Sequence, residues 1–269
     1  MPKIEINGRL LHYVATGTGE DTIVFSHGYL MRHQMFEAQI GAFSKSHRVI
    51  AFDHRGHGDS GTCQQAFGMY DLVDDAEQLI EGLCDGPVHF AGMSTGGYVG
   101  LRLLLRRPDL IKSLILMDTG ANAESPATLK QYNQLLFFVR LVGIRPLLGK
   151  VLPLLFGPTF RSDPARQAEF FQLKSYIGRL DRTSVRLFGR AIFDRDDVQD
   201  ALRALKNAPP TLIMVGEDDI PTPPATAQAM HEAIRGSELI SVPEAGHTSP
   251  LENPSFVTEA IDRFLKHQT

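Results

Sequence analysis

The feature that most restricts how this chain can fold is the segment Gly92-Met93-Ser94-Thr95-Gly96, in which a serine stands two residues from a glycine on either side. A strand-like apolar run at residues 88–91 precedes it, and a helix-compatible run at 98–106 follows it. A serine at such a tight strand-to-helix turn takes a strained backbone conformation, and the two glycines let the strand and the helix pass closely. The segment therefore predicts a nucleophilic serine, Ser94, whose hydroxyl projects from a sheet edge at a helix N-terminus.

Short apolar runs alternate with longer amphipathic runs on both sides of this segment, which is the pattern of βαβ units. We expect strands at residues 22–26, 48–52, 88–91, 113–117, 211–215 and 238–242. We expect helices at residues 33–43, 70–83, 96–106, 224–234 and 254–266. Asn7-Gly8, between two short apolar runs, predicts an opening β-hairpin. The predicted fold class is α/β, with a mostly parallel central sheet flanked by helices.

Residues 125–207 interrupt this alternation, because they read as several helices separated by prolines. We expect them to form a helical cap inserted into a core made of residues 1–124 and 208–269. A chain of 269 residues is long enough for one such domain with a modest insertion. Eight of the sixteen phenylalanines lie in this segment. Most of them should pack the helices of the cap, and the remainder should cover a pocket above Ser94.

A serine hydroxyl becomes an effective nucleophile when a base takes its proton and an acid orients that base. His247 comes soon after the last predicted strand, so its loop can bring it over the sheet edge. The segment Glu217-Asp218-Asp219 follows the preceding strand and offers three carboxylates, of which we choose Asp219 as the acid. Asp118, which ends the strand before the cap, is the fallback acid.

The loop His27-Gly28-Tyr29 follows a strand and should lie beside the nucleophile at the same sheet edge. The backbone amides of Tyr29 and Thr95 would then form an oxyanion hole, in which each donor stabilises the transition state by about 3 kcal/mol. We expect the His27 side chain to brace its own loop. The glycine-rich run at residues 53–60 holds His54 and His57, and we interpret it as a tight turn because no further ligand cluster completes a metal site.

Charge and cysteine content exclude several classes of partner. With 27 Lys and Arg against 31 Asp and Glu, the chain has a formal charge of -4 and no broad basic face for nucleic acid. Cys63 and Cys84 fit neither a disulfide framework nor a zinc site. The first residues lack the basic and apolar regions typical of a signal peptide, and no apolar run is long enough to span a membrane. We therefore expect a cytoplasmic protein with no nucleic-acid or membrane partner and no cofactor or metal.

Taken together, these segments resemble the α/β-hydrolase superfamily over essentially the whole chain. The likeness rests on four elements in order: the His27-Gly28 loop, the turn at residues 53–60, the Gly92 to Gly96 turn and the Gly246-His247 pair. In related enzymes the acid lies three residues after a glycine and four before a proline, which implies Asp219 rather than Asp218. Within the superfamily the chain is similar to small capped carboxylesterases, enol-lactone hydrolases and cofactor-free haloperoxidases.

The resemblance implies a serine hydrolase that cleaves a small to medium carboxylic ester or lactone through an acyl-enzyme on Ser94. A C–C bond hydrolase, a perhydrolase or an acyltransferase would use the same triad, and a ligand-binding sensor could retain it. Tyr29 stands where many perhydrolases carry tryptophan, which disfavours perhydrolase chemistry. The apolar cap predicts a preference for uncharged substrates, unless Arg140, Arg179 or Arg186 binds a carboxylate.

Overall fold

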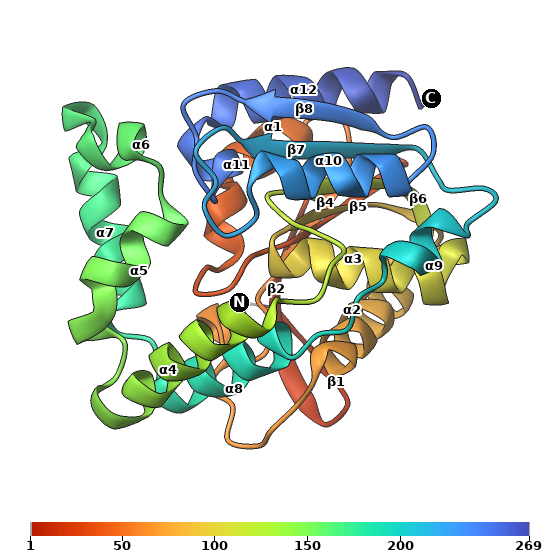
Figure 1. Ribbon diagram of the computed structural model, residues 1–269. Coiled ribbons are helices and arrows are strands. Elements are labelled where there is room, and N and C mark those ends of the chain that lie inside the picture. Colours follow the sequence, from red (N-terminus) through yellow and green to blue (C-terminus); the bar gives the residue numbers. More distant parts are fainter. Residues whose placement is uncertain (1, 269) are drawn as a thin grey trace.

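The computed structural model describes residues 2–268 and has a central sheet of eight strands with helices on both faces (Figure 1). The strand order is β1-β2-β4-β3-β5-β6-β7-β8. The strands are β1 (Lys3–Ile6), β2 (Arg9–Thr16), β3 (Thr22–Ser26), β4 (Arg48–Phe52), β5 (Val88–Met93), β6 (Ile111–Met117), β7 (Thr211–Gly216) and β8 (Glu238–Val242). From β4 to β8 all neighbours pair in parallel, whereas β1 and β2 are antiparallel to their neighbours. The predicted α/β fold class is confirmed.

The opening hairpin forms because Asn7 and Gly8 both adopt positive φ, at 52° and 71°. These angles suit the two-residue turn that joins β1 to β2, where Ile6 pairs with Arg9. Strand β5 extends two residues beyond its predicted end and includes Met93. The predicted helix at residues 33–43 begins as the 3-10 helix η1 (His33–Phe36) and continues as α1 (Glu37–Phe43).

Helices cover the sheet on both faces because its parallel strands are apolar on both sides. Phe25 of β3 packs in one buried cluster with Phe36 and Ile261, while its neighbour Val24 packs in the opposite cluster with Leu72 and Leu101. The core helices are α1, α2 (Met69–Leu83), α3 (Thr95–Arg106), α10 (Pro224–Ala233), α11 (Ser249–Glu252) and α12 (Pro254–Lys266). This double cover explains why the strands read as continuous apolar runs.

Between β6 and β7 the described chain contains helices and no strand. These helices are α4 (Pro126–Val142), α5 (Leu148–Leu155), α6 (Pro158–Ser162), α7 (Gln167–Ile177), α8 (Arg182–Phe193) and α9 (Gln199–Arg203). Helix α4 packs against α8, whereas α5 to α7 stand apart from the sheet (Figure 1). The division into a core and a cap at residues 125 and 207 stays a prediction. None of the helices in residues 2–268 is both long enough and apolar enough to cross a lipid bilayer.

Candidate active site

Ser94 occupies the sharp turn that joins β5 to α3. Its φ of 49° and ψ of −107° lie in a region that side chains rarely adopt, so the surrounding packing must hold this conformation. A Cβ atom on Gly92 would lie 2.3 Å from the carbonyl carbon of Gly96, and one on Gly96 would lie 2.0 Å from the carbonyl oxygen of Ser26. Glycine is therefore required at both positions, as the sequence pattern indicates.

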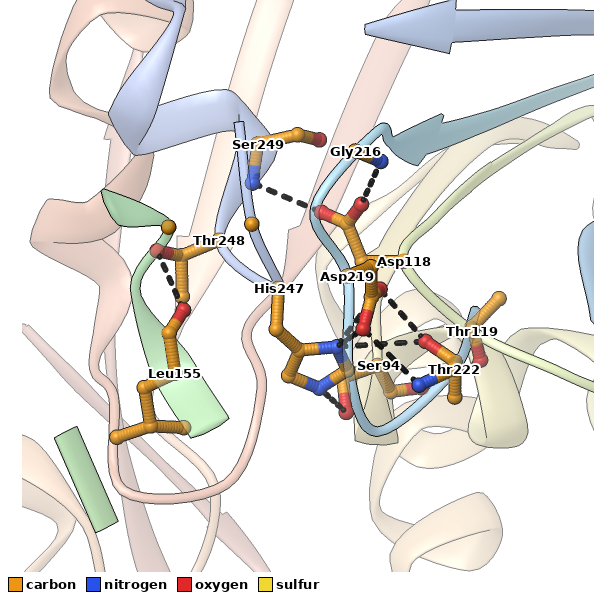
Figure 2. Close-up of polar contacts among 12 residues, drawn as sticks. Ser94, Asp118, Thr119, Leu155, Gly216, Asp219, Thr222, His247, Thr248 and Ser249 are labelled. Atoms are coloured by element: carbon orange, nitrogen blue, oxygen red, sulfur yellow. Dashed lines mark hydrogen bonds and ion pairs between the residues drawn. The ribbon is translucent and has the colours of Figure 1, made fainter. Parts of the chain in front are cut away.

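The structure brings Ser94, His247 and Asp219 together in one hydrogen-bonded series (Figure 2). Ser94 Oγ lies 3.0 Å from His247 Nε2. On the other side of the ring, His247 Nδ1 lies 2.9 Å from Asp219 Oδ2 and 3.0 Å from Oδ1. All three side chains are buried. This is the arrangement in which a histidine can take the proton of a serine while a carboxylate fixes its tautomer.

A turn after β7 positions the carboxylate of Asp219. The backbone amide of Thr222 donates to Asp219 Oδ1 at 2.9 Å, and the Thr222 hydroxyl donates to Oδ2 at 2.8 Å. Asp219 is thereby buried, whereas its neighbours Glu217 and Asp218 are exposed to solvent. Thr222 was not among the predicted site residues, although a threonine three residues after an aspartate is a recognisable signal for this turn.

Burial and charge act in opposite directions on His247. Burial lowers the pKa of His247, but the adjacent carboxylate of Asp219 outweighs burial and the net pKa is raised. The raised pKa means that the imidazolium form, which arises when the ring accepts the serine proton, is stabilised inside the site. It also means that the ring loses its capacity as a base when the pH falls through that raised pKa.

Asp118 bridges two loops of the site and does not contact His247. Its carboxylate accepts hydrogen bonds from the backbone amides of Gly216 and Ser249, each at 2.9 Å (Figure 2). Burial and the neighbouring charge of Asp219 raise the pKa of Asp118 to about 7. Asp219, and not Asp118, therefore contacts His247. Asp118 instead connects the segments that carry Asp219 and His247.

The loop after β3 lies directly beside the nucleophile. A Cβ atom on Gly28 would lie 2.4 Å from Met93 Sδ and 3.3 Å from Ser94 Cβ, so a larger residue there would have to displace the Met93 side chain. The amide of Thr95 opens helix α3, whose dipole favours negative charge at that end. Tyr29 follows Gly28 and lines the same cavity as Ser94, while the role of its amide as an oxyanion donor stays a prediction. The two predicted oxyanion donors thus come from neighbouring strands β3 and β5.

Comparison with known proteins agrees with this geometry. A family model described as the alpha/beta hydrolase fold matches residues 21–254. The chain belongs to the α/β-hydrolase family. The prediction of this superfamily is therefore confirmed.

Two solved structures resemble this α/β-hydrolase over their full length. The enol-lactonase from Burkholderia xenovorans LB400 superimposes with a TM-score of 0.90 at 26% identity, covering 98% of this chain and 100% of that one. A thermophilic esterase from Thermogutta terrifontis gives a TM-score of 0.90 at 30% identity, covering 100% and 99%. In sequence, a pimeloyl-[acyl-carrier protein] methyl ester esterase from Nitrosomonas europaea is 24% identical over 94% of this chain and 98% of that protein.

An apolar cavity lies above Ser94 and His247 in this α/β-hydrolase. Helix α4 contributes Tyr132, Leu135, Leu136 and Val139 to its wall, and α5, α8 and the loop after β3 contribute most of the rest. Of the eight phenylalanines in residues 125–207, Phe193 lines the cavity in the described chain. The apolar cover over the nucleophile is thus mainly aliphatic, and it contains fewer phenylalanines than the sequence analysis expected.

The charged groups at the cavity differ from those that the sequence analysis named. Arg140, Arg179 and Arg186 do not line the cavity, and the carboxylate of Glu124 does. Glu124 pairs with the buried Arg195 at 2.9 Å. The guanidinium of Arg195 also lies 3.9 Å from the ring centroid of Tyr98. Because Glu124 and Arg195 are 71 residues apart, local sequence patterns carry no signal for this pair.

Buried histidines hold the loops on which the oxyanion donors depend. His27 donates from Nδ1 to the Gly28 carbonyl at 2.7 Å, and its Nε2 accepts the amide of His54 at 3.0 Å, so this side chain braces its loop. His57 Nε2 accepts the amide of Leu30 at 3.1 Å. Leu30 has a φ of 65°, a strained value for leucine. Burial lowers the pKa of His57 to about 3, which keeps the ring neutral and able to accept this hydrogen bond.

The residues that could bind a metal ion are not His54 and His57, the two histidines considered from the sequence. In the described chain, the group whose ligand atoms lie close enough together to hold an ion is His12, His33 and Asp53. The Asp53 carboxylate lies 2.9 Å from Nδ1 of each of these histidines and also accepts backbone amides. His54 and His57 instead face Ser26 and Leu30. The absence of a metal stays a prediction.

We predict that His57→Leu lowers kcat by about 10- to 100-fold while KM changes little. The substitution removes the acceptor for the Leu30 amide, so the loop that carries the Tyr29 amide loses its fixed position. An oxyanion donor contributes mainly in the transition state, which is why kcat rather than KM should respond. Steady-state kinetics with a water-soluble aryl ester measure both constants.

His57→Gln provides the comparison, because its side-chain oxygen can again accept the Leu30 amide and should restore part of the rate. His267→Leu, at an exposed position near the C-terminus, should behave as the wild type. A His57→Leu protein with unchanged kcat would show that His57 does not position the loop.

Proposed function

We propose that this α/β-hydrolase cleaves small to medium, uncharged carboxylic esters or lactones through an acyl-enzyme on Ser94. The observation that carries this proposal is the series Ser94, His247 and Asp219 on the floor of an apolar cavity. The names of the similar proteins, an enol-lactonase and two esterases, support hydrolysis of an ester or lactone bond. A lactone is an ester whose alcohol stays attached to the acyl group, so one mechanism serves both.

In the acylation step, Ser94 Oγ attacks the ester carbonyl carbon while His247 Nε2 takes the hydroxyl proton. The amides of Tyr29 and Thr95 stabilise the negative charge on the carbonyl oxygen of the tetrahedral intermediate. His247 then gives its proton to the departing alcohol oxygen, and the bond between carbonyl carbon and that oxygen breaks. The acyl group remains on Ser94; the alcohol of an open-chain ester leaves, whereas the hydroxyl released from a lactone stays attached to the acyl group.

In the deacylation step, a water molecule takes the place of the alcohol. His247 Nε2 accepts a proton from the water as its oxygen attacks the acyl carbon, and the same two amides stabilise the second tetrahedral intermediate. When this intermediate collapses, His247 returns the proton to Ser94 Oγ and the carboxylic acid leaves. Throughout both steps the Asp219 carboxylate accepts a hydrogen bond from the N–H group at Nδ1 of His247, which keeps Nε2 directed at the reacting oxygen.

The proposal is tested by trapping the acyl group. An aryl ester reacted briefly with the enzyme and quenched in acid should leave the acyl group on the peptide that contains Ser94, detectable by its mass. Acylation of another residue, or turnover with no acylated peptide under conditions that trap known acyl-enzymes, would contradict the proposed mechanism.

We predict that the enzyme prefers a neutral ester to a matched ester that carries a carboxylate. Among the described residues, no Lys or Arg lines the cavity, and the nearby Arg195 is paired with Glu124. Moving a carboxylate from water into this cavity is therefore unfavourable. We expect kcat/KM for p-nitrophenyl hexanoate to exceed that of the p-nitrophenyl monoester of adipic acid by about tenfold or more.

The control is to test the same two substrates on Glu124→Gln. This variant removes the anionic partner of Arg195, so the ratio of kcat/KM between the neutral ester and the carboxylate ester should decrease. If the wild type instead favours the adipate monoester, the uncharged substrate class is wrong and a dicarboxylate-type enol-lactone becomes the better candidate.

A further inference from the structure

Positive charge is concentrated in the segment between β6 and β7. Residues 125–207 contain fourteen Lys and Arg and seven Asp and Glu, a formal charge of +7. The other residues contain thirteen Lys and Arg and twenty-four Asp and Glu, a formal charge of −11. The small net charge of the whole chain therefore hides a strong separation of charge, in which one part of the molecule attracts anionic surfaces and the rest is repelled by them.

Large apolar side chains are exposed on the same segment. Five of the eight exposed large apolar residues belong to it, and four of these lie within the last two turns of α4. These four are Phe137, Phe138, Leu141 and Val142, each more than half exposed. Their spacing puts them on one side of the helix, because positions three or four apart share a face. Lys130 and Arg140, also exposed, flank them on α4.

The opposite side of α4 lines the cavity above Ser94. Tyr132, Leu135, Leu136 and Val139 point inward to that cavity, while the four apolar residues named above face solvent. Helix α4 is therefore apolar on both sides, which a helix that only covered a pocket would not need. One helix joins an outward apolar surface to the place where an apolar substrate would be bound.

We propose that the outward face of α4 binds the surface of an anionic phospholipid bilayer. We call this the α4 face, and it consists of Lys130, Phe137, Phe138, Arg140, Leu141 and Val142. Exposed phenylalanine and leucine next to Lys and Arg on one helix match the composition of helices that lie in the headgroup region of a bilayer. Each basic residue near an anionic bilayer adds attraction, and each apolar side chain gains by leaving water.

A bilayer fits the α4 face better than a second copy of the chain does. Two copies joined through this face would bring two basic segments together, and their repulsion would oppose the contact. A bilayer also concentrates uncharged esters of the kind that the cavity suits, so the inference rests on the proposed function for its substrate. Binding to a bilayer surface departs from our expectation of no membrane partner. That expectation rested on the lack of a segment that could span a bilayer.

The experiment is sedimentation of the full chain with vesicles of stated composition. We expect binding to vesicles of equal parts phosphatidylglycerol and phosphatidylcholine to be about tenfold tighter than to phosphatidylcholine alone, and to weaken as salt screens the charges. Phe137→Ser combined with Phe138→Ser should weaken binding to the anionic vesicles by about tenfold. Arg140→Glu should weaken it in the same direction.

Matched controls change exposed residues elsewhere on the surface. Leu10→Ser and Tyr70→Ser remove exposed apolar side chains, and Arg263→Glu reverses an exposed charge on α12. None of the three should alter vesicle binding. Hydrolysis of a water-soluble ester should be unchanged in the Phe137 and Phe138 double variant, whereas hydrolysis of an ester embedded in anionic vesicles should fall.

Several results would overturn the inference. These are no binding to anionic vesicles, equal binding to neutral and anionic vesicles, or a double variant that binds as the wild type does. A wild-type dimer that the double variant converts to monomer would assign the face to a second copy, and capture of an acidic protein without vesicle binding would assign it to a protein partner. Vesicle binding needs no turnover, so a catalytically inactive Ser94→Ala protein should still bind, and the two proposals can fail separately.

Discussion

Ser94→Ala should lower kcat for an aryl ester by about a million-fold, the loss that removal of the nucleophile causes in comparable triads. Without the hydroxyl there is no atom to form the acyl-enzyme, and His247 has no proton to accept. The remaining rate would come from the oxyanion amides and from substrate binding in the cavity. The thermal midpoint of unfolding should change little, because the substitution removes one oxygen atom together with its hydrogen bond to His247.

The measurement pairs steady-state hydrolysis of p-nitrophenyl butyrate with covalent labelling by an organophosphonate. The wild type should be labelled at Ser94 and lose activity, whereas Ser94→Ala should resist labelling. Ser249→Ala is the matched control, because the Ser249 hydroxyl is buried close to the site and has no hydrogen-bond partner in the described chain. A fully active Ser94→Ala enzyme would end the proposed mechanism.

The order of strands and helices was predictable because local signals determine it here. Most parallel strands of the core are short apolar runs, and β3, β4, β5, β7 and β8 are each followed by a helix of the core. The turn at Ser94 was predictable for a steric reason, since glycine at 92 and 96 is the only residue that avoids a clash with neighbouring backbone. Both patterns are visible in neighbouring residues of the sequence, although the backbone atom that makes Gly96 necessary belongs to Ser26 on β3.

The contacts that shape the site depend on residues far apart in the chain. Asp118 joins Gly216 to Ser249, and His57 supports Leu30, through hydrogen bonds that no local pattern records. The two sides of α4 posed a related problem. Because both the buried and the exposed side are apolar, helical periodicity could not show which residues line the cavity and which face solvent.

The choice between Asp218 and Asp219 illustrates the limit of local reasoning. Both carboxylates follow the same strand, and three adjacent acidic residues are usually a solvated turn. The likeness to related enzymes favoured Asp219 through its spacing from Gly216 and Pro223. The structure gives a physical basis for that spacing, because the turn closed by Thr222 buries Asp219 and leaves Asp218 in solvent.

Asp219→Asn should therefore lower kcat by about ten-thousand-fold, while Asp218→Asn should have a small effect. The carboxylate of Asp219 accepts the Nδ1 proton of His247, which leaves Nε2 free to accept the proton of Ser94. An asparagine amide can donate to Nδ1 instead, which favours the tautomer with its proton on Nε2 and removes the base. The two variants differ by one position in the same loop, so they control for each other.

The pH dependence gives a second, independent test of the same assignment. The charge of Asp219 raises the pKa of His247 against the effect of burial, so replacing Asp219 by neutral asparagine should lower that pKa. Because His247 acts as a base in its neutral form, the acidic limb of the kcat profile should move to lower pH in whatever activity Asp219→Asn retains. Asp218→Asn should leave the limb in place, since Asp218 faces solvent. If the two variants exchange these phenotypes, the acid is Asp218 and the assignment is wrong by one residue.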